Sequence, residues 1–352
     1  MAKKEREPID FSVLRPAGSY FGDFERTASS AFTDFNELLR SIENAESAAN
    51  ELVKETEGNP ALHKDAPKTE AEKEPERPDL DTLLKELDEL VGLEKIKANV
   101  RSLINLVKVR KLREENDLPV PPMSLHLVFM GNPGTGKTTV ARLIAQLYYA
   151  IGVLSKGQLV EVDRSGLVAG YVGQTATKTL EVINSALGGV LFIDEAYALA
   201  PAGADISNDF GREAIETLLK AMEDNRRDLV VIVAGYEELM ERFISSNPGL
   251  ESRFNRYFVF EDYKGAELMK IFESMCRKNS YELDEKASAF AEKHFNELYD
   301  MRDDNFGNAR DVRNFCENVV SVHSDRVAAM ESPTKDDLVT ILEEDLDKAS
   351  VM

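Results

Sequence analysis

Several features that would take a chain out of the cytosol or make it a metalloprotein are missing from this sequence. Its 352 residues include only two cysteines, Cys276 and Cys316, too few for a disulfide framework, and both lie in segments with a helical pattern. We therefore expect buried, reduced thiols in a cytoplasmic protein. The four histidines are scattered without the spacing of metal ligands, which argues against a zinc site.

Long apolar runs and positive charge are also scarce. The N-terminal stretch MAKKEREPIDF lacks the apolar core of a signal peptide, and no run reaches about 18 consecutive apolar residues. We expect neither secretion by that route nor a membrane span. The formal net charge of -21 disfavours nucleic acid as the main substrate, because neutralising phosphates requires an excess of Lys and Arg. A local basic groove remains compatible with an acidic chain.

Composition divides the chain into five parts. Residues 1–19 are polar and predicted to be disordered, and residues 20–56 carry apolar side chains at near-helical spacing, which predicts an amphipathic helix or helical hairpin. Residues 57–82, rich in Glu, Lys and Pro, have the composition of a flexible linker. An α/β domain is predicted over residues 83–262 and a helical domain over residues 263–352.

Short apolar runs alternate with helical patterns in the α/β domain. This alternation predicts a mostly parallel five-stranded sheet covered by helices on both faces. The predicted strands are residues 125–130, 159–163, 190–194, 230–235 and 257–261.

The strand pattern stops after Asp262. Four helix-patterned segments follow and predict a small all-helical domain; they begin near Gly265, Asp284, Gly307 and Thr334. The last one opens with a Thr-x-x-Asp capping signal.

The stretch GNPGTGKT, residues 131–138, fits the phosphate-loop pattern between an apolar strand and a helical run. Its glycines let backbone N–H groups close on phosphates at the positive end of a helix, Lys137 reaches the outer phosphates, and the Thr138 hydroxyl ligates magnesium. The predicted nucleotide-binding residues here are Pro133, Gly134, Thr135, Gly136, Lys137, Thr138 and Thr139.

Two adjacent carboxylates end the apolar run VLFIDEA. Asp194 there suits the binding of Mg²⁺ through water, and Glu195 suits the orientation of an attacking water. A strand that merely ends in solvent-facing acids is the alternative. Together with the phosphate loop, the pair predicts ATP hydrolysis, with ATP and Mg²⁺ as cofactors.

Six motifs in order resemble the AAA+ ATPases, within them the branch that holds stage V sporulation protein K and the red-type Rubisco activases. They are GNPGTGKTTVARL, GYVGQT, GGVLFIDEAY, DLVVIVAGY, SNPGLESRF and FGNARDVRN, and the likeness covers roughly residues 84–348. The resemblance implies a large α/β domain, a helical lid and self-assembly into a ring, usually of six.

The resemblance also implies roles for two arginines. Arg253 matches the finger that acts on the neighbouring subunit's nucleotide, with Arg256 as the alternative, and a guanidinium supplied in trans ties hydrolysis to subunit contact. Arg310 matches the lid arginine that senses the terminal phosphate, with Arg313, one helical turn on, as the alternative. Surface salt bridges are the other interpretation of these side chains.

Two further positions carry weaker implications. Val91 and Gly92 match the segment that packs near adenine. Tyr236 stands where many AAA+ proteins have a polar residue beside the terminal phosphate, so its role stays open.

The loop GYVG, after the second predicted strand, matches the aromatic–hydrophobic–glycine pattern that threading machines place in the ring's pore. Tyr171, with Val172 and Gly173, would grip an extended polypeptide through apolar contact and shape, which requires no particular side chain in the substrate. The flanking glycines let the loop move. The alternative is that Tyr171 packs under the ring.

The sequence therefore predicts an ATP-driven remodeller of an unidentified protein substrate. There are two alternatives. One is a nucleotide-controlled scaffold that recruits partners through residues 20–56, and the other is a remodeller of the Rubisco-activase type. A nucleic-acid motor is disfavoured by the acidic balance and the GYVG loop.

Overall fold

The computed structural model describes residues 77–352, with gaps at 122, 172, 201–209, 304–305 and 352. The predicted disordered stretch, the amphipathic segment and most of the predicted linker therefore lie outside the described residues. Helix α2 (Leu80–Glu89) begins three residues before the expected domain boundary. Its N-cap is Asp79, whose carboxylate accepts a hydrogen bond from the Thr82 N–H at 2.9 Å.

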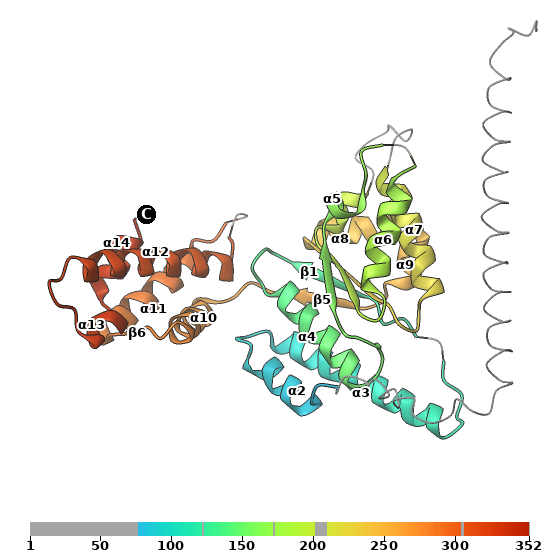
Figure 1. Ribbon diagram of the computed structural model, residues 1–352, viewed down its shortest axis with the longest axis horizontal. Coiled ribbons are helices and arrows are strands. Elements are labelled where there is room, and N and C mark those ends of the chain that lie inside the picture. The colour runs from blue at the N-terminus through green and yellow to red at the C-terminus, as the bar shows by residue number, and fades with distance from the viewer. Residues whose placement is uncertain (1–76, 122, 172, 201–209, 304–305, 352) are drawn as a thin grey trace, which may run out of the picture. The chain divides into compact units, whose positions relative to one another are not determined.

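A five-stranded parallel sheet forms the centre of the α/β domain, as the sequence predicted (Figure 1). The strands are β1 (Leu127–Gly131), β2 (Leu159–Val162), β3 (Val190–Ile193), β4 (Val230–Gly235) and β5 (Tyr257–Phe260). Their order is β2-β3-β4-β1-β5, so β4 lies between the strands that carry the phosphate loop and the acidic pair. Strand β5 alternates exposed and buried residues, as an edge strand does.

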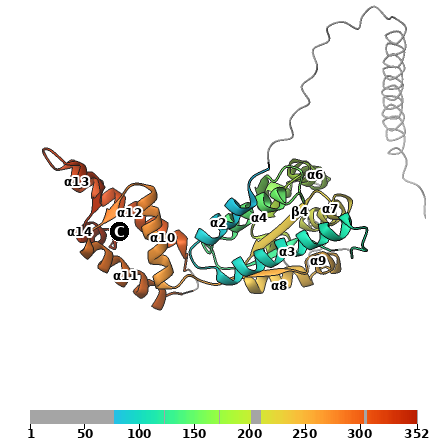
Figure 2. The same cartoon turned by 90° about the horizontal axis from the view of Figure 1, so that it is seen from below.

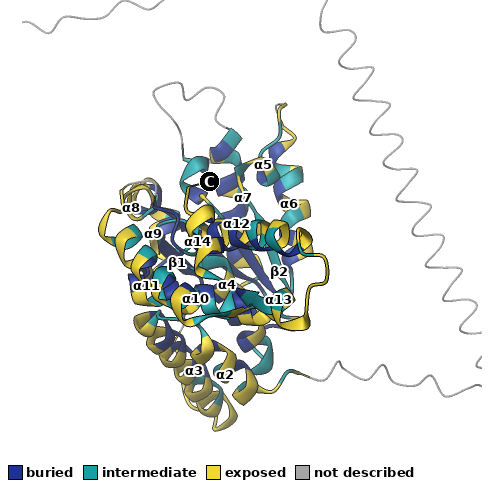
Figure 3. Ribbon diagram, turned by 90° about the vertical axis from the view of Figure 1, so that its left-hand side faces the viewer, coloured by how far each residue is buried: buried dark blue, intermediate teal, exposed yellow. Residues whose placement is uncertain are grey.

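Helices cover both faces of this sheet, because successive side chains of a strand point to opposite sides. Phe129 of β1 packs in one core with α2, α3 (Glu94–Glu115) and α4 (Lys137–Ala150), whereas Val128 and Met130 pack in the other. The second face is covered by α5 (Arg164–Leu167), α6 (Thr175–Ala186), η1 (Ala196–Leu199), α7 (Phe210–Asp224), α8 (Glu237–Ser245) and α9 (Pro248–Arg253). Figure 3 shows the strands as the buried layer and the outer helix faces as the exposed one.

The C-terminal domain is helical with two departures from the prediction. Its helices are α10 (Gly265–Lys278), α11 (Glu285–Asp300), α12 (Ala309–Ala328), α13 (Lys335–Val339) and α14 (Glu343–Ala349), so the fourth predicted segment is two helices (Figure 2). The second departure is a short parallel strand pair: β6 (Glu282–Leu283), which follows α10, pairs with β7 (Thr340–Ile341), which lies between α13 and α14. Strands of two residues are too short to show an alternating pattern.

Cys276 and Cys316 lie in this helical core as free, buried thiols, as predicted. The predicted capping signal is present, because the Thr334 hydroxyl accepts from the Asp337 N–H and the Asp337 carboxylate accepts from the Thr334 N–H. Free thiols and a helix cap are common in small helical domains. The functional role of this domain is therefore better judged from its contacts with the phosphate loop.

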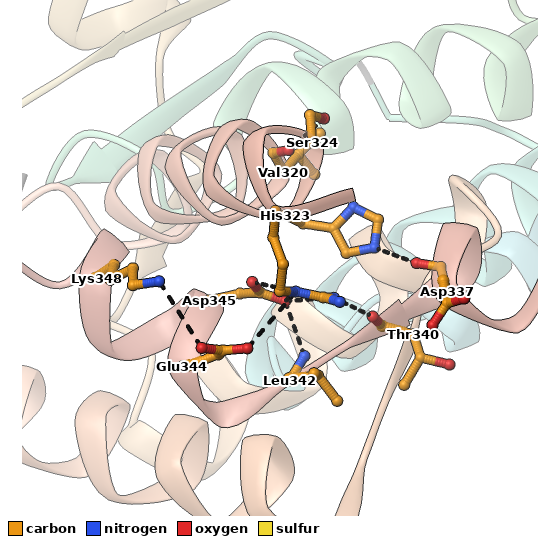
Figure 4. Close-up of polar contacts among 10 residues, drawn as sticks. Val320, His323, Ser324, Asp337, Thr340, Leu342, Glu344, Asp345 and Lys348 are labelled. Atoms are coloured by element: carbon orange, nitrogen blue, oxygen red, sulfur yellow. Dashed lines mark hydrogen bonds and ion pairs between the residues drawn. The ribbon is translucent and has the colours of Figure 1, made fainter. Parts of the chain in front are cut away.

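A buried ion pair holds the last helix of this domain in place. The Arg326 guanidinium on α12 donates to both oxygens of Asp345 on α14, at 2.8 Å and 2.9 Å, and to the Thr340 carbonyl at 2.9 Å (Figure 4). The Asp345 side chain is fully buried. The hydrogen bonds from Arg326 to Asp345 raise the pKa of Arg326 above the ordinary value, so the guanidinium stays charged.

Candidate nucleotide site

The carboxyl ends of three neighbouring strands form one cleft of about 530 Å³. The strand order brings the phosphate loop after β1, Tyr236 after β4 and the acidic pair after β3 into one row. The predicted site residues that line the cleft are Pro133, Gly134, Gly136, Lys137, Thr138, Thr139, Asp194, Glu195 and Arg310. Ligands of open α/β sheets bind at this edge.

The first carbonyls of the phosphate loop are turned toward its own lysine. The Lys137 ammonium donates to the Gly131 and Asn132 carbonyls, both at 2.8 Å, and the buried Thr135 hydroxyl donates to Asn132 at 2.8 Å. Burial lowers the pKa of Lys137, nearby Asp194 and Glu195 raise it, and Arg310 lowers it. A partly desolvated cation next to these carbonyls is suited to an anionic ligand such as a phosphate chain.

The next three carbonyls of the loop all accept hydrogen bonds from residues of the lid. The Asn308 carboxamide donates to the Pro133 carbonyl at 3.3 Å. The Ala309 N–H donates to the Gly134 carbonyl at 3.2 Å. The Tyr263 hydroxyl donates to the Thr135 carbonyl at 3.2 Å. A side chain on Gly134, where φ is +72°, would also collide with the Gly307 carbonyl. With the carbonyls engaged, the loop presents its N–H groups to the cleft, which suits phosphate binding.

Asn308 fixes the lid to the loop and was not anticipated from the sequence. It is fully buried, its carboxamide oxygen accepts from the Tyr263 N–H at 2.8 Å, and its nitrogen donates to Asp262 at 2.8 Å. Asp262 also accepts from Asn132 of the phosphate loop at 2.9 Å. An asparagine next to a lid arginine gives no signal in one sequence, because Asn is common in loops.

The acidic pair lines the same cleft as the phosphate loop. Glu195 adopts a left-handed backbone conformation (φ 47°, ψ 41°), which is uncommon outside glycine, and its N–H donates to the Asp194 carboxylate at 3.0 Å. The Thr138 hydroxyl donates at 3.4 Å to Glu161 of β2, a third carboxylate to which no motif in the sequence points.

These oxygens fit magnesium that arrives with a nucleotide. Mg²⁺ prefers one or two protein carboxylates together with phosphate oxygens and water. Among the described residues, no group of three or more His, Cys, Asp or Glu side chains could hold a metal ion without such help. Thr138 and Asp194 are the residues that would hold the ion, which would supply charge neutralisation between the phosphates.

Two tyrosines stand beside the acidic pair. The rings of Tyr197 and Tyr236 are 6.1 Å apart, and a side chain on Gly235 would collide with Tyr197. Burial and the neighbouring Glu195 carboxylate raise the pKa of Tyr197 to about 12. The Tyr197 ring therefore carries a neutral hydroxyl beside Glu195, and Tyr236 lines the cleft.

The two lid arginines and the two finger candidates lie in different places. Arg310 and its alternative Arg313 both line the cleft. Arg253 lies outside this cleft, where its guanidinium contacts Glu223 at 3.3 Å. Arg256 also lies outside and donates to the Met123 sulfur at 3.4 Å. Neither of the last two reaches its own chain's site, which is the arrangement that a residue acting in trans requires.

Val91 and Gly92 do not line the cleft. A side chain on Gly92 would meet Glu267 and Tyr263 of the lid, and the following Leu93 side chain lies near Gly136. The segment therefore packs beside the phosphate loop at the junction with the lid. An adenine-binding role for it stays a prediction.

The predicted pore loop lies between α5 and α6. Tyr171 is 74% exposed, the highest of the exposed large aromatic side chains among the described residues. A side chain added at Gly170 or Gly173 would meet no atom within 4 Å. Most of the Tyr171 side chain is therefore left uncovered by the described residues. Val172 falls outside the described residues.

Comparison with known proteins agrees with this geometry. Residues 127–262 match the ATPase family associated with various cellular activities (AAA), and residues 264–351 match the AAA lid domain. Over 263 residues the chain is 43% identical to stage V sporulation protein K of Bacillus subtilis, covering 74% of this chain and 81% of the relative.

Two further similarities extend this result. The chain is 43% identical over 270 residues to the chloroplastic ribulose bisphosphate carboxylase/oxygenase activase of Cyanidioschyzon merolae, covering 76% of this chain and 91% of the relative. The crystal structure of the FIGL-1 AAA domain in complex with ADP superposes with a TM-score of 0.53 at 19% identity, covering 75% and 82% of the two chains. The structural likeness concerns the fold. In the described residues, no helix is long and apolar enough to cross a membrane.

Proposed function

The chain belongs to the AAA ATPases of the stage V sporulation protein K and red-type Rubisco activase branch and hydrolyses ATP, and from this premise we propose that it is a ring-forming machine that pulls on a protein substrate. The ring is a homo-oligomer, usually of six in this family. ATP with Mg²⁺ binds in the cleft of each subunit. Free, buried cysteines suit work in the cytoplasm.

Hydrolysis in this proposal is completed by the neighbouring subunit. Lys137 and the loop N–H groups hold the phosphates, Asp194 and Thr138 hold the ion, and Glu195 orients water. Arg310 senses the terminal phosphate from the lid. Arg253 is supplied by the adjacent subunit, which would make each turnover depend on ring contact.

The exposure of Tyr171 is the observation that carries the pulling step. Tyr171 is 74% exposed at a loop tip, between glycines with open space around them, so its ring is free to contact a partner. An aromatic ring grips an extended chain without selecting particular residues. We place Tyr171, Val172 and Gly173 in the central pore on that ground.

A decoupling experiment tests the pulling step. The substrate probe is a fluorescent protein with an unstructured tail, whose unfolding is followed by loss of fluorescence. Tyr171→Ala is expected to retain ATP hydrolysis and to lose unfolding at least tenfold, whereas Tyr171→Phe, which keeps the ring, retains both. Unchanged unfolding by Tyr171→Ala would remove the pore-loop role.

A narrower substrate is suggested by one relative. The protein of Cyanidioschyzon merolae carries the name of a Rubisco activase. A carboxylase held in an inhibited state is therefore a second candidate substrate. Recovery of carboxylase activity, dependent on ATP and lost in Glu195→Gln, would support it; no recovery, while the tailed fluorescent protein is still unfolded, would exclude it.

A further inference from the structure

A second cleft, of about 640 Å³, lies at the opposite edge of the sheet from the nucleotide site. It is bounded by the C-terminal half of α3, the segment before β1, the turn after α4 and the start of β4. Its floor is apolar and includes Val107, Met123, Leu125 and Leu229. No residue of the proposed ATPase mechanism lines it.

The rim of this cleft is basic, although the chain as a whole is strongly acidic. Arg110, Lys111, Arg226 and Arg227 line it, against a single carboxylate, Glu114. Arg110 pairs with Glu114 at 3.2 Å and Arg226 with Glu223 at 3.6 Å, which leaves the rim with an excess of two positive charges. Within the described part of the chain, neither Lys111 nor Arg227 has an ion-pair partner. The site therefore favours an acidic occupant with apolar side chains.

An apolar stripe on α3 starts beside the cleft at Leu106 and crosses the outer face of the helix, away from the cleft. Leu106, Val109 and Leu112 are spaced three residues apart and are 40%, 54% and 56% exposed. Leu106 is one helical turn from Arg110 of the rim. A contiguous row of large apolar side chains beside basic ones is typical of a docking surface.

The chain enters the described structure at this cleft. A side chain on Gly152, which lines the cleft, would meet both the Arg77 guanidinium and the Lys111 ammonium. Arg77 is the first described residue and does not itself line the cleft, so the 76 residues before it start beside the rim. The composition of residues 57–76 predicts a flexible linker. A linker of that length has a root-mean-square span of roughly 25 Å, which would keep the preceding segment at a local concentration of about 1 mM.

Residues 20–56 have the complementary chemistry. They contain eight Asp or Glu against three Lys or Arg, a formal charge of -5. Phe32, Phe35, Leu39 and Ile42 recur at helical spacing, so a helix would present them on one face.

We propose that residues 20–56 dock onto this basic cleft and the apolar stripe of α3 in the same chain. The apolar face would fill the floor and cover the stripe, and the carboxylates would pair with the basic rim. With a local concentration of about 1 mM, an intrinsic Kd of about 0.1 mM leaves the segment docked for roughly nine-tenths of the time. The docking does not depend on the proposed pulling activity.

The cleft adjoins the segment that carries the finger candidates. Met123 of its floor accepts the hydrogen bond from Arg256, and the neighbouring Ser124 hydroxyl donates to the Arg253 carbonyl at 2.5 Å. An occupant that shifts the segment before β1 would therefore move the arginines that a ring neighbour needs. This contact gives the N-terminal segment a route to the ATPase rate.

Carbodiimide crosslinking of the full-length chain tests the docking, since it joins a carboxylate to an ammonium only in direct contact. We expect an amide between Lys111 and a carboxylate of residues 20–56, identified by mass spectrometry.

Lys111→Arg should abolish this product while keeping the charge. Arg226→Glu with Arg227→Glu should reduce its yield at least fivefold, and Glu43→Lys with Glu46→Lys added to that variant should restore it. Arg277→Glu with Lys278→Glu on α10 is the control and should change nothing.

Mixing chains of normal and heavy nitrogen content identifies the partner. Products in which both peptides carry the same isotope support docking within one chain, whereas mixed products would show that the cleft holds the segment of a second copy and would overturn the proposal. Absence of the Lys111 product in the folded, ATP-hydrolysing protein, or a yield unaffected by reversing the two arginines, would overturn it as well. Failure of substrate unfolding would bear on the pore-loop role alone.

Discussion

The Asn308 carboxamide donates to the Asp262 carboxylate at 2.8 Å, and through this contact the lid is fixed beside the phosphate loop. Asp262 accepts a second hydrogen bond from Asn132 of that loop. Arg310 follows Asn308 by two residues, so the position of the lid arginine depends on this buried contact. Coupling between phosphate binding and lid position therefore has a short physical path.

Replacing Asn308 separates its side-chain role from its backbone role. Its backbone has φ 55° and ψ -127°, a region that glycine adopts without strain. Asn308→Gly removes only the buried hydrogen bonds and should lower the free energy of unfolding by about 2–4 kcal/mol. Asn308→Ala should cost about 1 kcal/mol more. Denaturant unfolding measures both, and equal stability of the two variants would contradict the strain assignment.

Complementation between inactive subunits tests the finger. Arg253→Ala and Lys137→Ala should each reduce ATP hydrolysis by about 10³-fold or more. A one-to-one mixture should regain up to about a quarter of the normal rate, because an intact phosphate loop then meets an intact finger at that share of subunit contacts. A second one-to-one mixture, of Arg256→Ala with Lys137→Ala subunits, examines the alternative finger Arg256 in the same way. If rings form and no mixture regains activity, the trans role of Arg253 is wrong.

His126 makes stability depend on pH. Its ring is buried, its Nδ1 accepts the Val231 N–H at 3.0 Å, and burial, followed by the charge of Arg253, lowers its pKa to about 4. Between the ordinary value of 6.5 and about 4, the unfolded chain binds a proton that the folded chain does not. The free energy of unfolding should therefore fall as pH drops through this window, by about 1.4 kcal/mol per unit.

The comparison for this prediction is His126→Asn, whose side-chain oxygen can still accept a hydrogen bond. Carboxylates titrate in both proteins, so only the difference between their pH profiles reports on His126. The profiles should diverge by about 2 kcal/mol between pH 6.5 and 5. Parallel profiles over that range would contradict the prediction, because they would show that His126 has its ordinary pKa in the folded protein.

Removal of Asp345 should destabilise the lid. The variant Asp345→Ala leaves the Arg326 charge in a partly buried site without its bidentate partner, which costs about 3–5 kcal/mol in comparable buried pairs. Glu344→Gln is the matched control, since Glu344 is exposed and lies 4.0 Å from the same guanidinium, and it should cost less than about 1 kcal/mol. Thermal unfolding of both variants checks the difference; similar losses would mean that the buried pair adds nothing.

The sequence was sufficient for the parts of this protein that depend on local pattern. The buried strands β3 and β4 show as continuous apolar runs, and the glycine spacing of the phosphate loop specifies its chemistry. The order of the six motifs identified the family. All of these signals lie within a few neighbouring residues.

What the sequence did not reveal depends on contacts between distant segments. Glu161 meets Thr138 across 23 residues, and Asn308 meets Asp262 across 46 residues. The β6–β7 pair joins two residues to two others 58 positions on, which leaves no periodicity to detect. The basic cleft likewise gathers Arg110 and Arg227 from separate elements in an acidic chain.

Assembly under conditions that trap ATP tests the central claim most directly, since every step of the proposal requires a subunit boundary. Glu195→Gln should bind ATP without hydrolysing it, and sedimentation of this variant with ATP and Mg²⁺ at micromolar concentration should show a closed ring of about six chains. Omission of nucleotide, or the further change Lys137→Ala, should weaken that assembly. Sedimentation as the 39.3 kDa single chain with saturating ATP and Mg²⁺ would contradict the account.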